Sequence, residues 1–478
     1  MHHNPKQRQR ELLKRTLIYA IMTISVISLV VLSLFLVLGY NVDGDGPPEQ
    51  GGLVQFRSFQ TDAEISIDGS KQSIKTNSKK NLSAGYHNVS MSLKDYRGWS
   101  KSFDLGSGEL LWLNALLVPS RITTSEVTAF EQIASMKVSP DKKWIAIIEK
   151  PQDTILKIVD IRDEKKPKIT QLAIPENVVK ANPGDISKIV EWDFGSRYIL
   201  LTRTNGTKTD WIRLDRSDPS GARNVTALKN LNISDAHFVG TSGNVLQVLA
   251  AGVVQRVDIS RTDEKISSIA QNVREFELYN DDRVGFVGTK DTALVVGYYN
   301  DFTKKSRTIR TYPQDQPNVH NAITSYFNDD YQAISHGTTI DIIKNPLEEN
   351  RLFASFELQP GVQWLYFSNS GRFVVAQNGS SLSVYDLERK QNFVYTIPNN
   401  PPYTLGHHLK WLDDFHLVSD LGGVLTVFEY DGTNIETIGN VAPGHDMSLS
   451  NNGKRLFDIG INSVTQKPVL QSAVMVIE

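Results

Sequence analysis

The sequence predicts a mainly β protein in which one transmembrane helix is followed by a small β-sandwich and then by a β-propeller. Three observations lead to this fold class. Residues 16–42 contain no Asp, Glu, Lys or Arg, short stretches of residues 53–117 alternate between apolar and polar side chains, and a strand-rich unit recurs from Ile122 to the end. A chain of 478 residues exceeds one compact core, so several domains are expected.

The charge-free stretch is long enough to cross a membrane. Leu17 to Leu38 spans 22 residues, and about 20 helical residues cover a hydrocarbon layer of ~30 Å. Basic residues precede it and acidic residues follow it: Lys6, Arg8, Arg10, Lys14 and Arg15, then Asp43, Asp45 and Glu49. Positive flanks stay in the cytoplasm. We therefore predict a cytoplasmic tail at 1–15, a transmembrane helix at 16–40 and an extracytoplasmic remainder, in a single-pass protein of the cytoplasmic membrane.

A cleaved signal peptide is the alternative to this anchor. Its apolar core would span about 7–15 residues and end in a small-x-small site. The core here is longer, and Val37-Leu38-Gly39 is a poor cleavage site. The anchor is therefore the preferred interpretation, although the sequence leaves open whether it is ever cleaved.

Residues 41–51 have the Gly, Pro and Asp content of a linker. Their Asp-x-Asp-Gly stretch resembles the start of a calcium loop, but the twelfth position counted from Asp43 is Val54 and not Glu. The chain has no cysteine, which excludes disulfides, thiol catalysis and zinc–thiolate sites. A net charge of −2 provides no general attraction to nucleic acid.

Residues 52–119 predict a β-sandwich. Alternating stretches at 53–59, 63–67, 86–93 and 109–117 are separated by turns such as Asp68-Gly69 and Ala84-Gly85. Three motifs in this region are Ala-Glu-Ile-Ser-Ile-Asp-Gly at 63–69, Leu-Ser-Ala-Gly-Tyr-His-Asn-Val at 82–89, and Tyr-Arg-Gly-Trp at 96–99. The region resembles the PEGA domain, although Gln60-Thr61-Asp62-Ala63 replaces that family's naming tetrad. The resemblance implies a binding or scaffolding module outside the membrane of a prokaryote. Apart from the resemblance, Tyr96 and Trp99 are expected to be core or edge aromatics of the sandwich.

From about residue 120 to 478 the recurring unit is an apolar strand, a polar turn and a second apolar strand. The turns fall near residues 139, 193, 240, 280, 328, 369, 413 and 451, at spacings from 38 to 54. A strand-only period of this length is typical of a β-propeller, with four strands to a blade. Because a single blade cannot bury its apolar faces, we expect Trp144, Trp192, Phe367 and Trp411 to pack between blades.

The units resemble the propeller repeats of TolB-like proteins, and Ser139-Pro140-Asp141 keeps the full triplet of that repeat. Eight turns predict eight blades, with seven as the alternative. The last unit has room for only three strands, so we expect a segment near Ile122 to Phe130 to add its fourth strand and close the ring.

Motifs of known chemistry are missing. The sequence has neither a Gly-x-Ser-x-Gly elbow nor a nucleotide-binding Gly-x-x-x-x-Gly-Lys-(Ser/Thr) loop. His407, His408 and His416, near Asp413 and Asp414, are interpreted as surface residues rather than a metal site. Asp281-Asp282 and Asp329-Asp330 are interpreted as solvated turn residues rather than paired catalytic carboxylates.

The sequence therefore predicts a membrane-anchored binding or scaffold protein that is not an enzyme, with no cofactor, metal or catalytic residues and with unknown binding residues. Its expected partners are the membrane, envelope proteins or surface glycans, and not nucleic acid. The alternatives are a glycan lyase or hydrolase, and a sensor that acts through a partner in the membrane. The enzyme alternative predicts several convergent acidic, His, Arg or Tyr side chains with shifted pKa values at the end of the propeller's central channel. The ligand and the oligomeric state stay open.

Overall fold

The protein is mainly β, as predicted, with 53% of residues in strands and 8% in helices. The structure is a computed structural model and describes residues 5–37, 40–41, 49–180, 182–261, 266–398 and 408–477. The chain divides into two compact units, Met1–Arg121 and Ile122–Glu478. His407 and most of the predicted linker lie outside the described residues.

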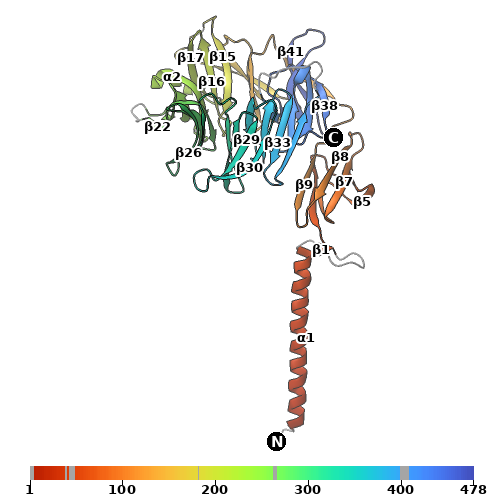
Figure 1. Cartoon of the computed structure of the whole chain (residues 1–478). Helices are drawn as coiled ribbons and strands as arrows, with labels where there is room; N and C mark the ends of the chain where they lie inside the picture. The colour runs from red at the N-terminus through yellow and green to blue at the C-terminus, as the bar shows by residue number, and fades with distance from the viewer. Residues whose placement is uncertain are drawn as a thin grey trace. The chain divides into compact units, whose positions relative to one another are not determined.

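The first unit begins with a single long helix, α1 (Pro5–Val37), drawn in Figure 1. Leu12–Leu34 is long and apolar enough to span a membrane or to serve as a signal sequence, and it has no side chain buried by protein. The helix starts before the predicted span because Lys, Gln, Glu and Arg in the basic tail are good helix formers. Two-residue strands, β1 (Tyr40–Asn41) and β2 (Glu49–Gln50), pair with each other after the helix.

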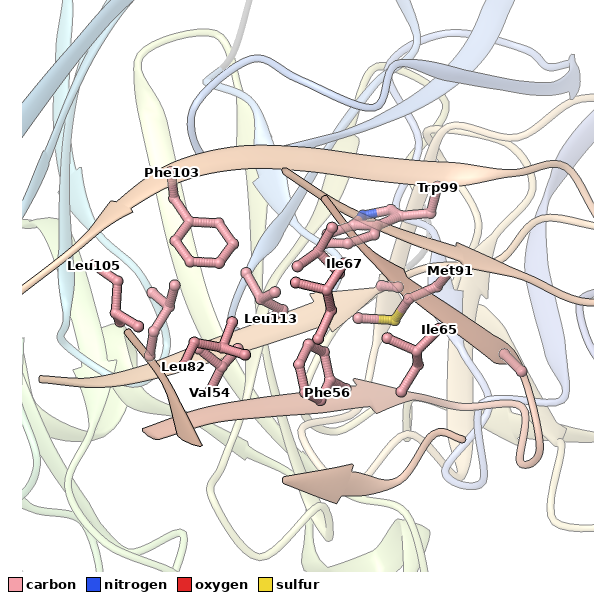
Figure 2. Close-up of a cluster of buried hydrophobic side chains, with 14 of the residues drawn as sticks. Val54, Phe56, Ile65, Ile67, Leu82, Met91, Trp99, Phe103, Leu105 and Leu113 are labelled. Atoms are coloured by element: carbon pink, nitrogen blue, oxygen red, sulfur yellow. The ribbon is translucent and has the colours of Figure 1, made fainter. Parts of the chain in front are cut away.

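The rest of the first unit contains two facing sheets. Their strands are β3 (Gly52–Ser58), β4 (Glu64–Ile67), β5 (Ser70–Lys75), β6 (Ser78–Leu82), β7 (Gly85–Ser92), β8 (Trp99–Leu105) and β9 (Leu110–Ala115). One sheet has the order β6-β3-β9, in which β3 and β9 are parallel, and the other has the order β5-β4-β7-β8. Figure 2 shows that side chains of both sheets, among them Phe56, Ile65 and Trp99, form one buried cluster.

The β4–β5 turn is the one that the sequence predicts at Asp68-Gly69. Both residues have positive φ, 50° at Asp68 and 77° at Gly69, which is the conformation that two-residue hairpins require. Trp99 is buried and Tyr96 packs against the same core.

The second unit is a β-propeller made of four-stranded antiparallel sheets, which Figure 1 shows as successive groups of arrows. The strands of its first four sheets are β11 (Ser135–Val138), β12 (Trp144–Ile148), β13 (Ile155–Asp160) and β14 (Lys168–Ala173); β15 (Ile186–Trp192), β16 (Tyr198–Asn205), β17 (Lys208–Asp215) and β18 (Arg223–Asn224); β19 (Ile233–Phe238), β20 (Val245–Ala250), β21 (Val253–Asp258) and β22 (Ser267–Ala270); β23 (Val273–Tyr279), β24 (Arg283–Lys290), β25 (Ala293–Asn300) and β26 (Lys305–Pro313).

The next three sheets continue in chain order. The last sheet combines the final three strands of the chain with β10, which comes from the start of the unit. Their strands are β27 (Asn321–Tyr326), β28 (Asp329–His336), β29 (Thr339–Lys344) and β30 (Arg351–Glu357); β31 (Trp364–Phe367), β32 (Phe373–Asn378), β33 (Ser381–Asp386) and β34 (Gln391–Thr396); β35 (Lys410–Trp411), β36 (His416–Ser419), β37 (Val424–Glu429) and β38 (Glu436–Asn440); β39 (Ser448–Leu449), β40 (Arg455–Ile461), β41 (Pro468–Val474) and β10 (Thr124–Ala129).

The short helices are η1 (Pro219–Gly221), α2 (Val225–Lys229) and η2 (Leu421–Gly423). In the last sheet, β10 pairs antiparallel with β41. This pairing confirms the prediction that a segment near Ile122 to Phe130 supplies the missing strand.

Buried side chains fill the spaces between consecutive sheets. One cluster joins Ala146 and Ile148 of the first sheet to Ile189 and Trp192 of the second. Another joins Ile145 of the first sheet to Phe457 and Ile459 of the last, so the end of the chain packs against the start of the unit. Trp144, Phe367 and Trp411 border such clusters, which confirms the predicted role of the aromatic residues between sheets.

Candidate functional site

One end of the propeller carries the turns that the sequence singled out. Because strands alternate in direction, turns from first to second strand and from third to fourth strand of each sheet lie at the same end. We call this end the turn face. All eight predicted turn positions, from 139 to 451, lie in or beside first-to-second-strand turns. Neighbouring turns touch: Asp141 N donates to Ser196 Oγ at 3.2 Å.

Buried polar side chains hold these turns in shape. Asp193 is fully buried, and its carboxylate accepts hydrogen bonds from the backbone N–H groups of Gly195, Arg197 and Tyr198 at 2.6–3.1 Å. Ser139 Oγ accepts one from Trp144 N at 3.0 Å. A turn fixed in this way presents its other side chains in one arrangement, which is what a binding surface needs.

Three exposed phenylalanines lie on the turn face. Phe194 is 58% exposed in the β15–β16 turn, Phe302 is 86% exposed in the β25–β26 turn, and Phe327 is 76% exposed in the β27–β28 turn. Among the residues that the structure describes at the opposite end, the exposed large apolar side chains are aliphatic, such as Val464 in the β40–β41 turn. Exposed aromatic side chains are frequent anchors of protein and ligand interfaces.

Arginines gather on the turn face of the first two sheets. The guanidinium carbons of Arg162 and Arg216 lie 4.6 and 3.7 Å from the centroid of the Trp144 ring. Those of Arg197 and Arg213 lie 5.1 and 4.9 Å from the centroid of the Tyr198 ring. This part of the face combines positive charge with aromatic surface.

Next to the turn face, the first strands of neighbouring sheets are linked through acidic side chains. Glu191 on β15 accepts a hydrogen bond from Phe238 N on β19 at 2.6 Å, and its other oxygen lies 2.9 Å from His237 Nδ1. Glu277 on β23 accepts one from Ile323 N on β27 at 2.9 Å. Asp446, ahead of β39, accepts one from Val138 N on β11 at 3.3 Å.

Six charged or titratable side chains on or beside the first strands form what we call the first-strand cluster: Glu191, Asp235, His237, Glu275, Glu277 and His320. His237 lies between the carboxylates of Glu191 and Asp235, with Nε2 3.7 Å from Asp235. Its ring also meets Phe276 edge-on, with 5.4 Å between ring centroids. His320 Nδ1 lies 3.5 Å from Glu275.

The cluster shifts the protonation of its members. Burial lowers the pKa of His237, but hydrogen bonds and negative charge from Asp235 and Glu191 outweigh this effect and raise the pKa to about 10. Burial raises the pKa of Glu277 to about 7, although the Ile323 N–H bond and the charge of His237 oppose the rise. Both groups keep part of their surface open to solvent. At neutral pH the cluster therefore holds a charged imidazole beside a carboxyl that exchanges its proton.

The sequence missed this cluster. Glu191, His237 and Glu277 each stand near the end of an apolar first strand, and a charged residue in that place was the available signal. The signal is weak because such residues are 40 or more positions apart in the chain. Only the closure of the sheets brings them together.

The histidines that the sequence weighed as metal ligands are not brought together. The interpretation of His416 as a surface residue is wrong, because it begins the buried strand β36 and contacts both oxygens of Asp413 at 2.8 Å. The His408 ring lies 4.5 Å from the Tyr366 ring between centroids. Among the residues that the structure describes, no group of three or more His, Asp or Glu side chains is placed to hold a metal ion.

Asp281-Asp282 lies in the β23–β24 turn, as predicted, whereas Asp329-Asp330 begins strand β28. Asp282, Asp329 and Asp330 take part in ion pairs. Arg283 contacts Asp282 at 3.0 Å and Asp330 at 2.8 Å, and Lys344 contacts Asp329 at 2.7 Å. They therefore join neighbouring strands and sheets.

The sequence matches no family model and no curated protein. Solved structures that resemble the chain include an oligogalacturonate lyase in complex with manganese, with 11% identity and a TM-score of 0.40, covering 74% of this chain and 97% of that one. The Dos1 propeller has 12% identity and a TM-score of 0.46, covering 74% and 95%. The dihydro-heme d1 dehydrogenase NirN in complex with DHE has 10% identity and a TM-score of 0.43, covering 65% and 67%.

The prediction that the chain is not an enzyme is wrong, because the sequence does not exclude catalytic activity. Two of these similar structures, the lyase and the dehydrogenase, are enzymes. The prediction relied on missing sequence motifs. A site assembled from several sheets of a propeller leaves no contiguous motif, so the missing motifs excluded nothing.

Proposed function

We propose that the chain is a single-pass membrane protein that holds an eight-bladed propeller outside the cytoplasmic membrane. In this proposal residues 1–15 are the cytoplasmic tail, 16–40 the span, 41–51 the linker, 52–119 a PEGA-like module and 120–478 the propeller. The support is the apolar surface of Leu12–Leu34, which no protein covers, and the basic residues that precede it.

Cysteine labelling tests this topology directly because the chain has no cysteine of its own. We expect a membrane-impermeant maleimide to label Ser463→Cys, on an exposed turn, in spheroplasts. A Gln9→Cys variant should react only after the membrane is permeabilised. Labelling of both variants, or of neither, in intact spheroplasts would contradict the topology. Recovery of the chain in the soluble fraction without its tail would instead show a cleaved signal.

We further propose that the turn face binds an envelope protein or a surface glycan. The observation that carries this proposal is the location of Phe194, Phe302 and Phe327 on this one end, each more than half exposed. Exposed aromatic rings cost solubility unless they are covered, so their gathering on rigid turns favours an interaction surface.

Site-specific photo-cross-linking tests the surface. A photoreactive phenylalanine at position 302 or 327 should give cross-linked products in cells. The same residue at Val464, which is 87% exposed at the opposite end, is the matched control. Equal products at all three positions would show that the turn face is not preferred.

A second candidate function is acid–base catalysis at the first-strand cluster, for example in a lyase or hydrolase acting on glycans. The specific observation in its favour is that Glu277 has a pKa of about 7 beside the charged His237, because a general acid or base works best near the operating pH. The convergence of acidic and histidine side chains with shifted pKa values supports the enzyme alternative derived from the sequence.

Complementation separates the two functions. In cells that lack the chromosomal copy, Glu277→Gln should abolish rescue if the cluster is catalytic, and Phe302→Ser with Phe327→Ser should abolish it if the turn face binds the partner. Each variant must keep the wild-type Tm for its result to count. Rescue by Glu277→Gln at the wild-type level would remove the catalytic candidate.

A further inference from the structure

Arg213 is a buried arginine on β17, three residues before the turn that leads to η1. It is 7% exposed. Its neighbour across the β17–β18 pair is Arg223, so the two arginines share one face of the sheet. The guanidinium packs on the ring of Tyr198, with 4.9 Å between the guanidinium carbon and the ring centroid.

No acceptor in the described part of the chain satisfies Arg213. Its Nε is buried without a hydrogen-bond partner, and no carboxylate lies within ion-pair distance of the guanidinium. Asp215, an acidic residue on the same face of β17 whose charge acts on Arg213, is already engaged by other groups. Both of its oxygens accept hydrogen bonds from Arg197 at 2.7–3.1 Å, and Oδ1 also accepts from Ser217.

The other two buried arginines in the described residues have the acceptors that Arg213 lacks. Arg203 contacts Asp185, Ser187 Oγ and two backbone carbonyls. Arg372 contacts Asp386 and Glu388. Since burying an unpaired charge costs stability, the fold pairs these two arginines fully and leaves Arg213 unpaired.

The charges around Arg213 increase the cost. Burial lowers the pKa of Arg213, and the nearby positive charges of Arg223 and Arg197 lower it further, against the opposing effects of Tyr198 and Asp215. Asp215 is the one carboxylate whose charge offsets those of Arg223 and Arg197 at Arg213, and Arg197 already binds it. A second negative group at this place would relieve both the unsatisfied donors and the repulsion between the arginines.

We propose that Arg213, with Arg223 and Arg197 beside it, forms a binding site for the oxyanionic group of a small molecule: a phosphate, sulfate or carboxylate. The planar fork of arginine donates two parallel hydrogen bonds to such groups. Arg213 supplies the buried fork, and Arg223 and Arg197 add positive charge at the edge of the turn face. Tyr198, on which Arg213 packs, lines the same place.

Thermal unfolding of the full chain in detergent tests the site. At constant ionic strength, replacing chloride by phosphate or sulfate should raise the Tm of the wild type with saturation. Acetate in place of phosphate distinguishes a site for carboxylates from one for tetrahedral oxyanions. If no oxyanion raises the Tm above its value in chloride, the proposal is overturned.

Variants locate the effect. Arg213→Met should lose the oxyanion response while keeping at least the wild-type Tm in chloride, because it removes an unpaired buried charge. The matched control Arg351→Met removes an exposed arginine, whose side chain is 60% exposed, and should keep the full response. An unchanged response in Arg213→Met would refute the assignment.

If Arg213→Met does not fold, two milder variants decide the question by calorimetric titration with inorganic phosphate. Arg223→Gln and Arg213→Lys should each weaken binding by about 10-fold or more, since each loses charge-assisted hydrogen bonds. Wild-type affinity in both variants would overturn the proposal as well.

Discussion

Asp386 should be one of the most sensitive positions in the propeller. Its side chain is fully buried at the end of β33 and accepts hydrogen bonds from Arg372 Nε at 2.9 Å and Arg372 Nη2 at 2.7 Å. It also accepts hydrogen bonds from the backbone N–H groups of Glu388 and Arg389 at 2.9 and 3.3 Å. Asp386→Ala removes all four interactions and leaves Arg372 buried.

The expected loss of stability depends on which interactions Arg372 retains in the Asp386→Ala variant. Removing one partner of a buried ion pair costs about 3–5 kcal/mol. Arg372 keeps its contact with Glu388 at 2.6 Å, and Glu388 is partly exposed, so we expect the lower end, about 3 kcal/mol. The second unit has 357 residues (478 minus 121). At roughly 2.1 cal/mol/K per residue, a loss of this size lowers Tm by about 4 °C if the unit unfolds cooperatively.

Differential scanning calorimetry of the full chain measures this change. Asp160→Ala is the matched control because Asp160 ends the third strand β13 and binds Arg162 through the same two nitrogens, at 2.9 and 2.6 Å. Arg162 is 58% exposed, so water replaces the lost carboxylate and the Tm should fall less. Equal losses in the two variants would show that burial does not set the cost.

Three further predictions concern single positions. Asp458→Asn should raise the Tm more near pH 8 than near pH 5, because burial raises the pKa of Asp458 to about 7 and the folded state loses stability as the pH rises from the unfolded pKa of about 4 to that value; an equal gain at both pH values would contradict this. Gly297→Ala should lower stability by about 1–3 kcal/mol in denaturant titrations, because its Cβ would lie 2.1 Å from the Phe286 ring, whereas Gly439→Ala, with open space around it, should change nothing. His87 lies between two acceptors, 2.7 Å from a carboxylate oxygen and 2.8 Å from a backbone carbonyl; burial lowers its pKa, but these bonds raise it overall. Its contribution to the first unit should be complete below about pH 6.5 and lost as the pH rises through the higher folded value, and a flat stability curve from pH 6 to 9 in hydrogen exchange would disprove this.

Much of the propeller was predictable because its signals are local. The turns near residues 139 and 193 are marked by Ser139 and Asp193, whose side chains bond to the backbone a few residues later. The missing strand of the last sheet was also predictable, because a sheet with only three strands leaves an edge that the unit must cover. The end of the chain and the segment near Ile122 were the unmatched pieces.

The candidate sites were not predictable in the same way. Glu191 and His237 are 46 residues apart in the sequence, and nothing near either residue indicates the other. His408 and His416 are close in the sequence, yet they face different neighbours. Proximity along the chain is a poor guide in a propeller, where contacts between sheets cross one whole repeat.

The sequence by itself determined the features that depend on short stretches: the apolar segment that can span a membrane, the alternation of the strands, the turns and the recurring unit. Hydrophobic periodicity and turn chemistry act within a few residues, so they can be recognised without a structure. The tertiary structure alone decided which charged side chains meet and which are left without a partner. Nothing in the sequence around Arg213 distinguishes it from other arginines. It lacks an acceptor because Arg197 already binds the carboxylate of Asp215, and because its cross-strand neighbour on β18 is another arginine, Arg223. The electrostatic environment of a side chain depends on its burial and on the charges that the closed propeller places around it. These charges come from strands that are far apart in the chain.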